Sequence, residues 1–237
     1  MSDPSLPPEA PPQRPIRRAK AAALARAKPA AAAGDDATRA PLTPERWVDA
    51  ATEVLVDQGI DHVRVDVLAP QLGVTRGSFY WHFRDREELL RRVLQAWRER
   101  ATEQLTERLE RAHADPREQL RDLISLPHRG RAAMRAARIE LAIRAWARRD
   151  ATARQAVDEA DASRIGYIAQ VLSALGFPIA EARARAFVLY GTMLAEALMP
   201  TLGNAAQREE RARFVERLMT QPLAGVAAAP AAQAVAG

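Results

Sequence analysis

A chain of 237 residues can hold one large domain or two smaller ones, and 48% hydrophobic with 27% charged residues predicts that most of it folds. It contains no cysteine, which excludes disulfide bonds, thiolate catalysis and cysteine zinc sites and suits a reducing cytoplasm. The formal net charge is +5, and the only lysines are Lys20 and Lys28. This basic balance permits a polyanionic partner but does not identify one.

Both ends of the chain are predicted to be disordered. Residues 1–42 carry most of the proline-rich sequence and few large apolar side chains, so they cannot offset the entropy lost on ordering; a second tail is expected at 222–237. The N-terminus lacks the apolar stretch of a secretory signal. No apolar run reaches the roughly 20 residues of a membrane span. We therefore expect a cytoplasmic protein without membrane contact.

Helical patterns begin at Thr43. The segment TPERWVDAATEVLVDQG places Thr43 at an N-cap, Pro44 at the first helical position and Gly59 just past the end. A second, short helix is expected over about 65–72, a third from Thr75 to near Phe83, and a long fourth from about 84 to 110. The fourth is expected to turn these apolar residues inward: Leu90, Leu94, Trp97, Ala101 and Leu105.

The junction between the second and third helices has the form of a helix-turn-helix motif. Gly73 follows Leu72 where a left-handed residue ends a helix, and Val74 supplies the apolar contact that accompanies such an end. Thr75 is then expected to cap the next helix. Two short helices joined by three residues are the helix-turn-helix arrangement. Pro70 cannot donate a backbone hydrogen bond, so we expect the second helix to begin late or to be distorted.

The third helix carries the aromatic run FYWHF. Phe79 and Phe83 are four residues apart, so they share one face and are predicted to belong to a core. Tyr80 and Trp81 point elsewhere and His82 lies near the helix end, so these three are expected to face outward. Such a run alone is more often core, but the cap, the turn and the flanking arginines together favour contact with a phosphate backbone.

The stretch GIDHVRVDVLAPQLGVTRGSFYWHF, followed by RDREELL, resembles the DNA-binding domain of the tetracycline-repressor (TetR) family of bacterial transcription regulators over roughly residues 43–95. The resemblance implies base contacts in the major groove for the start of the third helix and phosphate contacts for the aromatic cluster. Arg64 stands where the family usually has Ser or Thr, and we expect it to reach a phosphate. The expected DNA-binding residues are Arg64, Thr75, Arg76, Gly77, Ser78, Tyr80, Trp81, His82 and Arg86.

The rest of the chain also has helical patterns, without strand-like alternation or a long repeat. Further helices are expected at about 116–126, 131–148, 151–175, 179–199 and 206–220. The sequence therefore predicts an all-α protein. A helix-turn-helix DNA-binding domain over 43–100 is expected to precede a helical ligand-binding and dimerisation domain over 101–221.

The last two helices are the candidate dimer interface. The helix expected at 179–199 is apolar on nearly all sides apart from Glu196, so it must be buried on several of them. The family resemblance implies that both helices form a four-helix bundle with those of a second copy, and a monomer core is the alternative. The expected interface residues are Ala186, Gly191, Phe214 and Leu218.

A ligand pocket is expected among the helices from about 101 onward, where polar or aromatic side chains stand among apolar ones. The candidates are Met134, Arg138, Trp146, Tyr167 and Tyr190. Each of them alone is as well explained by packing or solvation. Because no cluster of like charges is apparent, an apolar or aromatic small molecule is expected.

No motif indicates an enzyme, a metal site or a cofactor. The four histidines do not pair at ligand spacing, and no HExxH, GxGxxG, Walker A or GxSxG is present. Glu140 and Arg144 are spaced as an ordinary helix ion pair.

The predicted function is a homodimeric transcription regulator, most often a repressor in the family it resembles. It is expected to bind an imperfect palindromic operator in double-stranded DNA and to be released by a small-molecule effector. One alternative is a DNA-binding regulator without a small-molecule ligand. The other is an all-α ligand carrier or enzyme in which residues 73–90 are only core.

Overall fold

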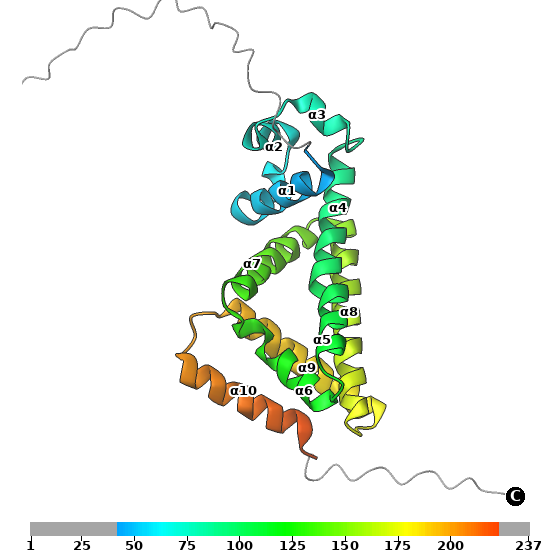
Figure 1. The fold of residues 1–237 in the computed structure, drawn as a ribbon, viewed down its shortest axis with the longest axis vertical. Helices are drawn as coiled ribbons and strands as arrows, with labels where there is room; N and C mark the ends of the chain where they lie inside the picture. Colours follow the sequence, from blue (N-terminus) through cyan, green and yellow to red (C-terminus); the bar gives the residue numbers. More distant parts are fainter. Residues whose placement is uncertain (1–41, 223–237) are drawn as a thin grey trace, which may run out of the picture. The chain divides into compact units, whose positions relative to one another are not determined.

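The computed structural model describes residues 42–222, and within that range the chain is helical and contains no strand (Figure 1). The predicted tails at 1–42 and 222–237 lie outside the described residues, except for their innermost residue. The helices are α1 Pro44–Gln58, α2 Val65–Leu72, α3 Arg76–Tyr80, α4 Arg86–Arg98, α5 Gln104–Ala112, α6 Pro116–Ser125, α7 Gly130–Ala147, α8 Ala151–Ala174, α9 Ile179–Leu198 and α10 Ala205–Thr220. The predicted all-α fold is confirmed.

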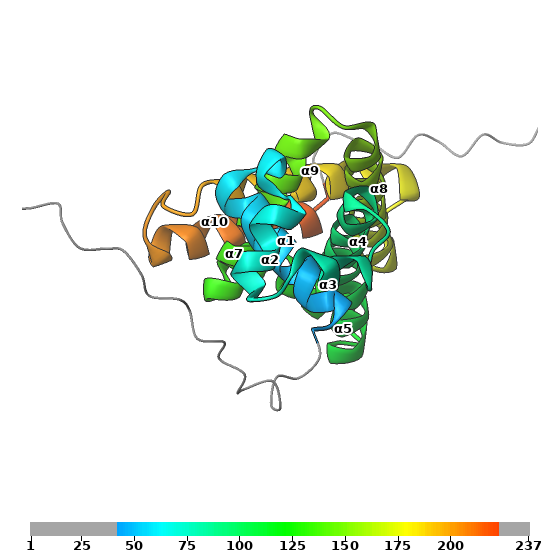
Figure 2. The ribbon, with the colours of Figure 1, turned by 90° about the horizontal axis from the view of Figure 1, so that it is seen from above.

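Helices α1, α2 and α3 pack together at one end of the described chain, as seen from that end in Figure 2. The ring of Trp47 meets that of Phe79 edge-to-face, with centroids 5.4 Å apart, and both side chains are fully buried. Phe83 stacks on Phe79 at 5.3 Å. Aromatic pairs of this kind add to the free energy of burying the rings, so the three rings strengthen a core that also contains Leu55 and Leu68.

The long helix after α3 is interrupted. Between α4 and α5 the residues Glu99–Glu103 form a π-helical turn. Such a turn accommodates one extra residue and shifts the inward face by one position. The inward residues Leu90, Leu94 and Trp97 are buried as predicted. From the π turn onward the predicted Ala101 and Leu105 are only partly buried, and the buried positions are Thr102 within the turn and Leu109 beyond it.

The hydrophobic core does not divide at the predicted domain boundary near residue 100. The cluster built around Trp47 and Phe79 continues into Ile143 and Trp146 of α7 and into the first turns of α8. A second cluster joins α5 and α6 to the second half of α8 and to α9 and α10. Helix α7 and the beginning of α8 thus pack directly against the helix-turn-helix unit.

Helix ends follow the sequence with two exceptions. Asp150 accepts a hydrogen bond from the amide of Ala153, and Asn204 forms a reciprocal capping box with Gln207. Thr43 and Thr75 are the N-cap residues, as predicted, but their hydroxyls accept no hydrogen bond from a helix amide. Instead, the amides of Arg46 and Ser78 donate to the backbone carbonyls of Thr43 and Thr75, respectively, each at 3.1 Å.

Helix α2 begins at Val65, so the expectation that Pro70 would delay its start is wrong. The amides of Val67 and Leu68 both bond to the carbonyl of Arg64, which closes the first turn. Only Gln71 and Leu72 follow the proline, and the missing donor therefore affects one bond near the helix end.

Candidate nucleic-acid interface and ligand cavity

The turn between α2 and α3 has the geometry that the sequence predicts. Gly73 adopts φ 68° and ψ 35°, which is the left-handed region that favours glycine. Its amide donates to the carbonyl of Pro70 and the amide of Val74 to that of Ala69, each at 3.0 Å. This pair of backbone hydrogen bonds is a Schellman motif, and it fixes the angle at which α3 leaves α2.

The aromatic run separates as predicted. Phe79 and Phe83 are buried, whereas Tyr80 is 64% exposed and Trp81 is 88% exposed. His82 is only half-buried, so it faces outward less fully than expected. Packing within residues 42–222 does not explain why a side chain as large and apolar as Trp81 is exposed. Tyr80 and Trp81 therefore form a surface that is available to a ligand.

Arg76, Gly77 and Ser78 form the first turn of α3. Arg76 is exposed and makes no ion pair with any residue between 42 and 222. A Cβ on Gly77 would meet nothing nearer than Oγ1 of Thr75 at 3.7 Å, which is ordinary contact, so the surrounding protein does not require a glycine there. Ser78 is partly exposed.

The other arginines of the motif are engaged to different degrees. Nη2 of Arg64 lies 3.3 Å from Oδ2 of Asp66, and Nε of Arg84 lies 2.9 Å from Oδ2 of Asp85; all four side chains are largely exposed. Exposed pairs of this kind are weak and can be exchanged for other anions.

Arg86 differs from these two because its guanidinium is directed into the protein. Nε donates to the carbonyl of Val63 at 2.6 Å and Nη2 donates to that of Ile60 at 2.7 Å. The side chain thereby fixes the turn before α2 to the start of α4. A role limited to phosphate contact does not describe this residue.

A cavity of about 660 Å³ lies between the π turn and α5 on one side and α7, α8 and α9 on the other. Its size falls within the roughly 300–1,000 Å³ typical of small-molecule sites. Much of its wall is apolar and is formed by Trp97, Leu105, Ile139, Ile168 and Met193.

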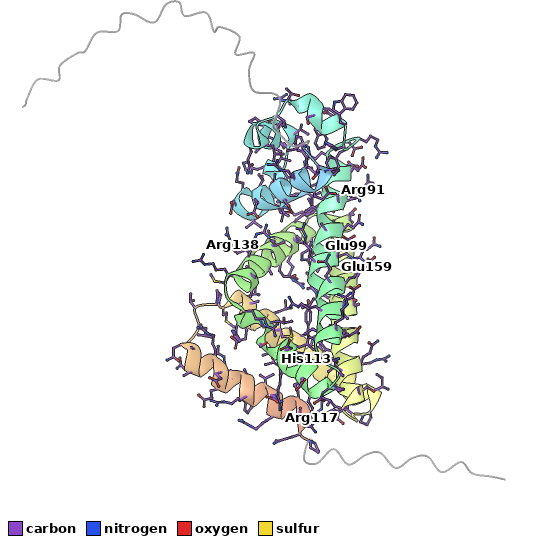
Figure 3. The ribbon with its side chains drawn as sticks, viewed as in Figure 1. Arg91, Glu99, His113, Arg117, Arg138 and Glu159 are labelled. Carbon is purple, nitrogen blue, oxygen red and sulfur yellow. The ribbon has the colours of Figure 1, made fainter. Side chains whose placement is uncertain are left out.

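The structure brings together two of the five predicted ligand residues. Tyr167 and Tyr190 line the cavity, and the other three do not. Trp146 is buried in the core shared with the helix-turn-helix unit, and Met134 is exposed to solvent. Arg138 points outward from α7 and pairs with Asp57 of α1 at 2.7 Å (Figure 3). These three assignments are wrong because helical spacing does not tell which side of α7 faces the cavity.

Glu140 and Arg144 are more than an ordinary helix ion pair. They belong to a half-buried network with Asp161, Arg164 and Tyr190, in which Arg144 contacts Glu140 at 2.7 Å and Arg164 contacts it at 3.2 Å. The hydroxyl of Tyr190 donates to Asp161 at 2.6 Å. Burial raises the pKa of Tyr190 to about 12, so the hydroxyl stays protonated and remains a donor. Two arginines balance two carboxylates here, and the network is neutral.

The charge on the cavity wall contradicts the expectation that no cluster of like charges is available. Five arginines and one glutamate line the cavity, a net charge of +4. Three of these arginines pair with carboxylates outside the lining: Arg100 with Asp49, Arg129 with Asp122 and Arg135 with Glu53. Arg164 pairs with Glu140 inside it. Arg108 makes no ion pair with any residue that the structure describes.

Helices α9 and α10 expose an apolar face. Phe187 is 68% exposed, Phe214 is 57% exposed, and Val188 and Leu218 are also exposed. Gly191 lies on the exposed side of α9. Ala186 is fully buried within the chain, so its assignment to a dimer interface is wrong; it packs in the core beside α8. The sequence analysis missed Phe187 because the apolar residues of α9 showed no single face.

Residues 42–222 contain neither a metal-binding cluster nor a membrane-spanning helix. No group of three or more His, Asp or Glu side chains is arranged to hold a metal ion. None of the helices there is long and apolar enough to cross a membrane.

The helix-turn-helix region matches a family model described as "Bacterial regulatory proteins, tetR family" over residues 48–93. Residues 48–93 are a tetR-family domain. A regulator from Pseudomonas putida, the HTH-type transcriptional regulator SrpR, is 47% identical over 58 residues, which are 24% of this chain and 27% of SrpR. The chain thus matches about a quarter of this relative's length. The predicted resemblance to the TetR family is confirmed over residues 48–93.

Beyond the tetR-family domain the likeness is one of fold. A transcriptional regulator from Rhodococcus sp. RHA1 superposes with a TM-score of 0.60 at 22% identity, covering 75% of this chain and 96% of that one. Bacillus subtilis FadR, solved in complex with stearoyl-CoA, superposes with a TM-score of 0.55 at 21% identity over 74% of this chain and 97% of its own. The helices that follow the tetR-family domain therefore have the fold of such regulators.

Several cavity residues were not predicted from the sequence. For one of them, Arg164, the sequence pattern does indicate a buried position. Arg164 stands four residues from both Ala160 and Ile168, which are buried on the same face of α8. A charged residue inside an apolar stripe indicates a buried polar group that needs partners. No comparable pattern marks Arg108, because its own helix is charged on several faces.

Proposed function

We propose that the protein is a transcription regulator that binds double-stranded DNA as a homodimer and responds to a small molecule. The observation that carries the proposal is the exposed surface of Arg76, Tyr80 and Trp81, held on a buried aromatic core inside a tetR-family domain. An enzyme does not fit this arrangement, and the relatives of the domain are named as transcriptional regulators.

In this proposal the first turn of α3 enters the major groove. Arg76 reaches base edges, with Ser78 beside it, and the bare backbone of Gly77 lets the helix approach the DNA closely. Tyr80, Trp81 and His82 contact phosphates, together with Arg64 once it leaves Asp66. Arg86 and Thr75 support these groups from the sides.

The apolar face of α9 and α10 is proposed to pair with the same face of a second copy. Large apolar side chains that stay exposed in the single chain are typical of an interaction site. A two-fold dimer would present two recognition helices to half-sites one or more helical turns apart, so the operator is expected to be an imperfect palindrome.

The cavity is proposed to hold the effector. Two of the arginines that line it reach α1 of the DNA-binding unit: Arg100 pairs with Asp49 at 3.0 Å, and Arg135 pairs with Glu53. A ligand that displaced these contacts would change how α1 is held. Coupling of this kind is reciprocal, so such a ligand would bind more weakly to the DNA-bound dimer. A regulator without a small-molecule ligand is the second candidate.

The proposal is tested with the DNA upstream of the gene and with a random duplex of equal length. Affinity for both is measured across salt concentrations. Phosphate contacts release counterions, so the logarithm of affinity is expected to fall steeply and linearly with that of salt concentration. The upstream DNA should bind about 1,000-fold or more tightly than the random duplex. Equal affinity for the two would rule out sequence-specific regulation, and a flat salt dependence would rule out DNA binding through this surface.

A further inference from the structure

We infer that the cavity binds an amphipathic anion, a molecule with an apolar body and one carboxylate-type head. Two residues of the cavity wall carry donors for which residues 42–222 provide no acceptor, and the apolar lining leaves room for a chain or ring beyond the head. This inference names the class of effector for the proposed regulator, and it stands or falls separately from DNA binding.

The first donor is the hydroxyl of Tyr167. It is buried and has no hydrogen-bond partner among residues 42–222, and Tyr167 is one of the residues that line the cavity. An unsatisfied buried polar group costs about 1–3 kcal/mol, so a site that keeps one gains when a ligand supplies the partner. Burial, with the nearby charge of Glu110, raises the pKa of Tyr167. The hydroxyl therefore stays protonated, and the partner it lacks is an acceptor.

The second donor is Arg108 of α5. Its guanidinium is the one charged group of the lining for which residues 42–222 provide no ion-pair partner. When Asp49, Glu53 and Asp122 are counted with the arginines that they neutralise, one positive charge is left over in the cavity wall. A negatively charged oxygen is an acceptor that suits either of these donors, and charge-assisted bonds, as to Arg108, which is exposed to solvent, are the stronger ones.

The same wall disfavours a cation. Among residues 42–222, Glu140 is the only acidic residue in the lining, and its carboxylate already contacts Arg144 and Arg164. Trp97 is covered by Arg164, whose guanidinium carbon lies 5.2 Å from the ring centre, so this ring face is already occupied by a positive group. A positively charged ligand would meet arginines and no free carboxylate.

The test compares three ligands that share one ten-carbon chain: decanoate, decan-1-ol and decyltrimethylammonium. Each is titrated calorimetrically into the full-length protein below its micelle-forming concentration. We expect decanoate to bind about tenfold or more tightly than decan-1-ol, a difference of about 1.4 kcal/mol. The ammonium compound should bind most weakly. Comparable affinity for decanoate and decan-1-ol, tighter binding of the cation, or binding of none of the three and none of their octyl counterparts would overturn the inference.

Two variants locate the head group. Arg108→Gln and Tyr167→Phe should each weaken decanoate about tenfold while leaving decan-1-ol nearly unchanged. Tyr167→Phe removes only the unsatisfied hydroxyl, so its thermal stability should equal or exceed that of the parent. The matched control is Arg111→Gln on the same helix, because Arg111 pairs with Glu107 and does not line the cavity. If the control weakens decanoate as much as Arg108→Gln does, the head is not held at Arg108.

Operator affinity is measured separately, with and without decanoate. Binding in the expected pattern without a change in operator affinity would leave the ligand class intact and contradict the proposed ligand response. Tight operator binding together with the overturning pattern above would contradict the ligand class and leave the DNA-binding proposal intact.

Discussion

At the scale of single residues, two arginines of the helix-turn-helix region, Arg76 and Arg86, have different roles. Arg76 is exposed and unpaired among the described residues, whereas Arg86 donates to two backbone carbonyls. Their spacing from the aromatic run does not distinguish them. The partners of Arg86 lie 23 and 26 residues earlier in the chain, so only the fold brings them together.

Arg76→Ala is expected to weaken binding to the operator far more than to random DNA. A good bidentate contact to a base contributes about 1–3 kcal/mol of discrimination, and random DNA does not supply the matching base. Band-shift titrations on both duplexes measure the two losses. Tyr80→Phe serves as the comparison, because a phosphate contact should be lost equally on both. If Arg76→Ala reduced both affinities by the same factor, the residue would contact phosphates only.

Arg86→Ala is expected to destabilise the fold rather than only the complex with DNA. The substitution removes two hydrogen bonds from a charged donor and takes from the Val63 carbonyl its recorded partner, whereas the Ile60 carbonyl keeps the amide of Val63, so the free energy of unfolding should fall by about 1–3 kcal/mol. Urea unfolding measures it. Arg92→Ala on the same helix is the control, since Arg92 is exposed and makes no recorded side-chain hydrogen bond within 42–222. Equal stability of the two variants would contradict a structural role for Arg86.

At the scale of elements, the sequence predicts most helices to within one or two residues, because prolines, glycines and capping residues mark their ends. Gly73 and Asp150 are clear examples. The π turn at Glu99–Glu103 could not be predicted in this way. Its residues have ordinary helical propensities, and the extra residue becomes visible only when α4 and α5 pack against different partners.

Deleting Ala101 is expected to convert the π turn into regular α-helix. The faces of α4 and α5 would keep their present partners, so the midpoint of thermal unfolding should be unchanged or higher. Arg100 and Thr102 line the cavity from this turn, and their displacement should weaken decanoate about tenfold. Calorimetry measures both, with Ala101→Ser as a control that keeps the chain length. A deletion variant that unfolds more easily would show that packing, not ligand binding, maintains the π turn.

At the scale of the whole molecule, the two hydrophobic clusters do not coincide with the two predicted domains. Ile143 and Trp146 of α7 belong to the core of the helix-turn-helix unit. A sequence contains no direct record of such long-range packing, because apolar residues on α7 are equally suited to either core. The boundary near residue 100 was predicted from where the helix-turn-helix sequence pattern ends. The hydrophobic core around that unit extends further along the chain, into α7 and α8.

Introducing Phe187→Glu together with Phe214→Glu is expected to convert the proposed dimer into a monomer. Both side chains are more than half exposed in the single chain, so the charges should not disturb its fold. Loss of the paired recognition helices should weaken operator binding by about 100-fold or more. Sedimentation velocity gives the oligomeric state. Leu141→Glu is the control, because Leu141 is an exposed apolar residue on α7 rather than on α9 or α10. An unchanged dimer would place the interface elsewhere.

The four tryptophans lie in three different environments. Trp81 stands in solvent on the proposed DNA surface, Trp97 lines the cavity under Arg164, and Trp47 and Trp146 are buried in the first core. Intrinsic fluorescence should therefore distinguish the two binding events without a label. Operator DNA should quench emission from Trp81 and a cavity ligand emission from Trp97. Trp81→Phe should abolish the first signal and keep the second, and a signal from DNA that survived this change would have to arise from a rearrangement reaching the interior.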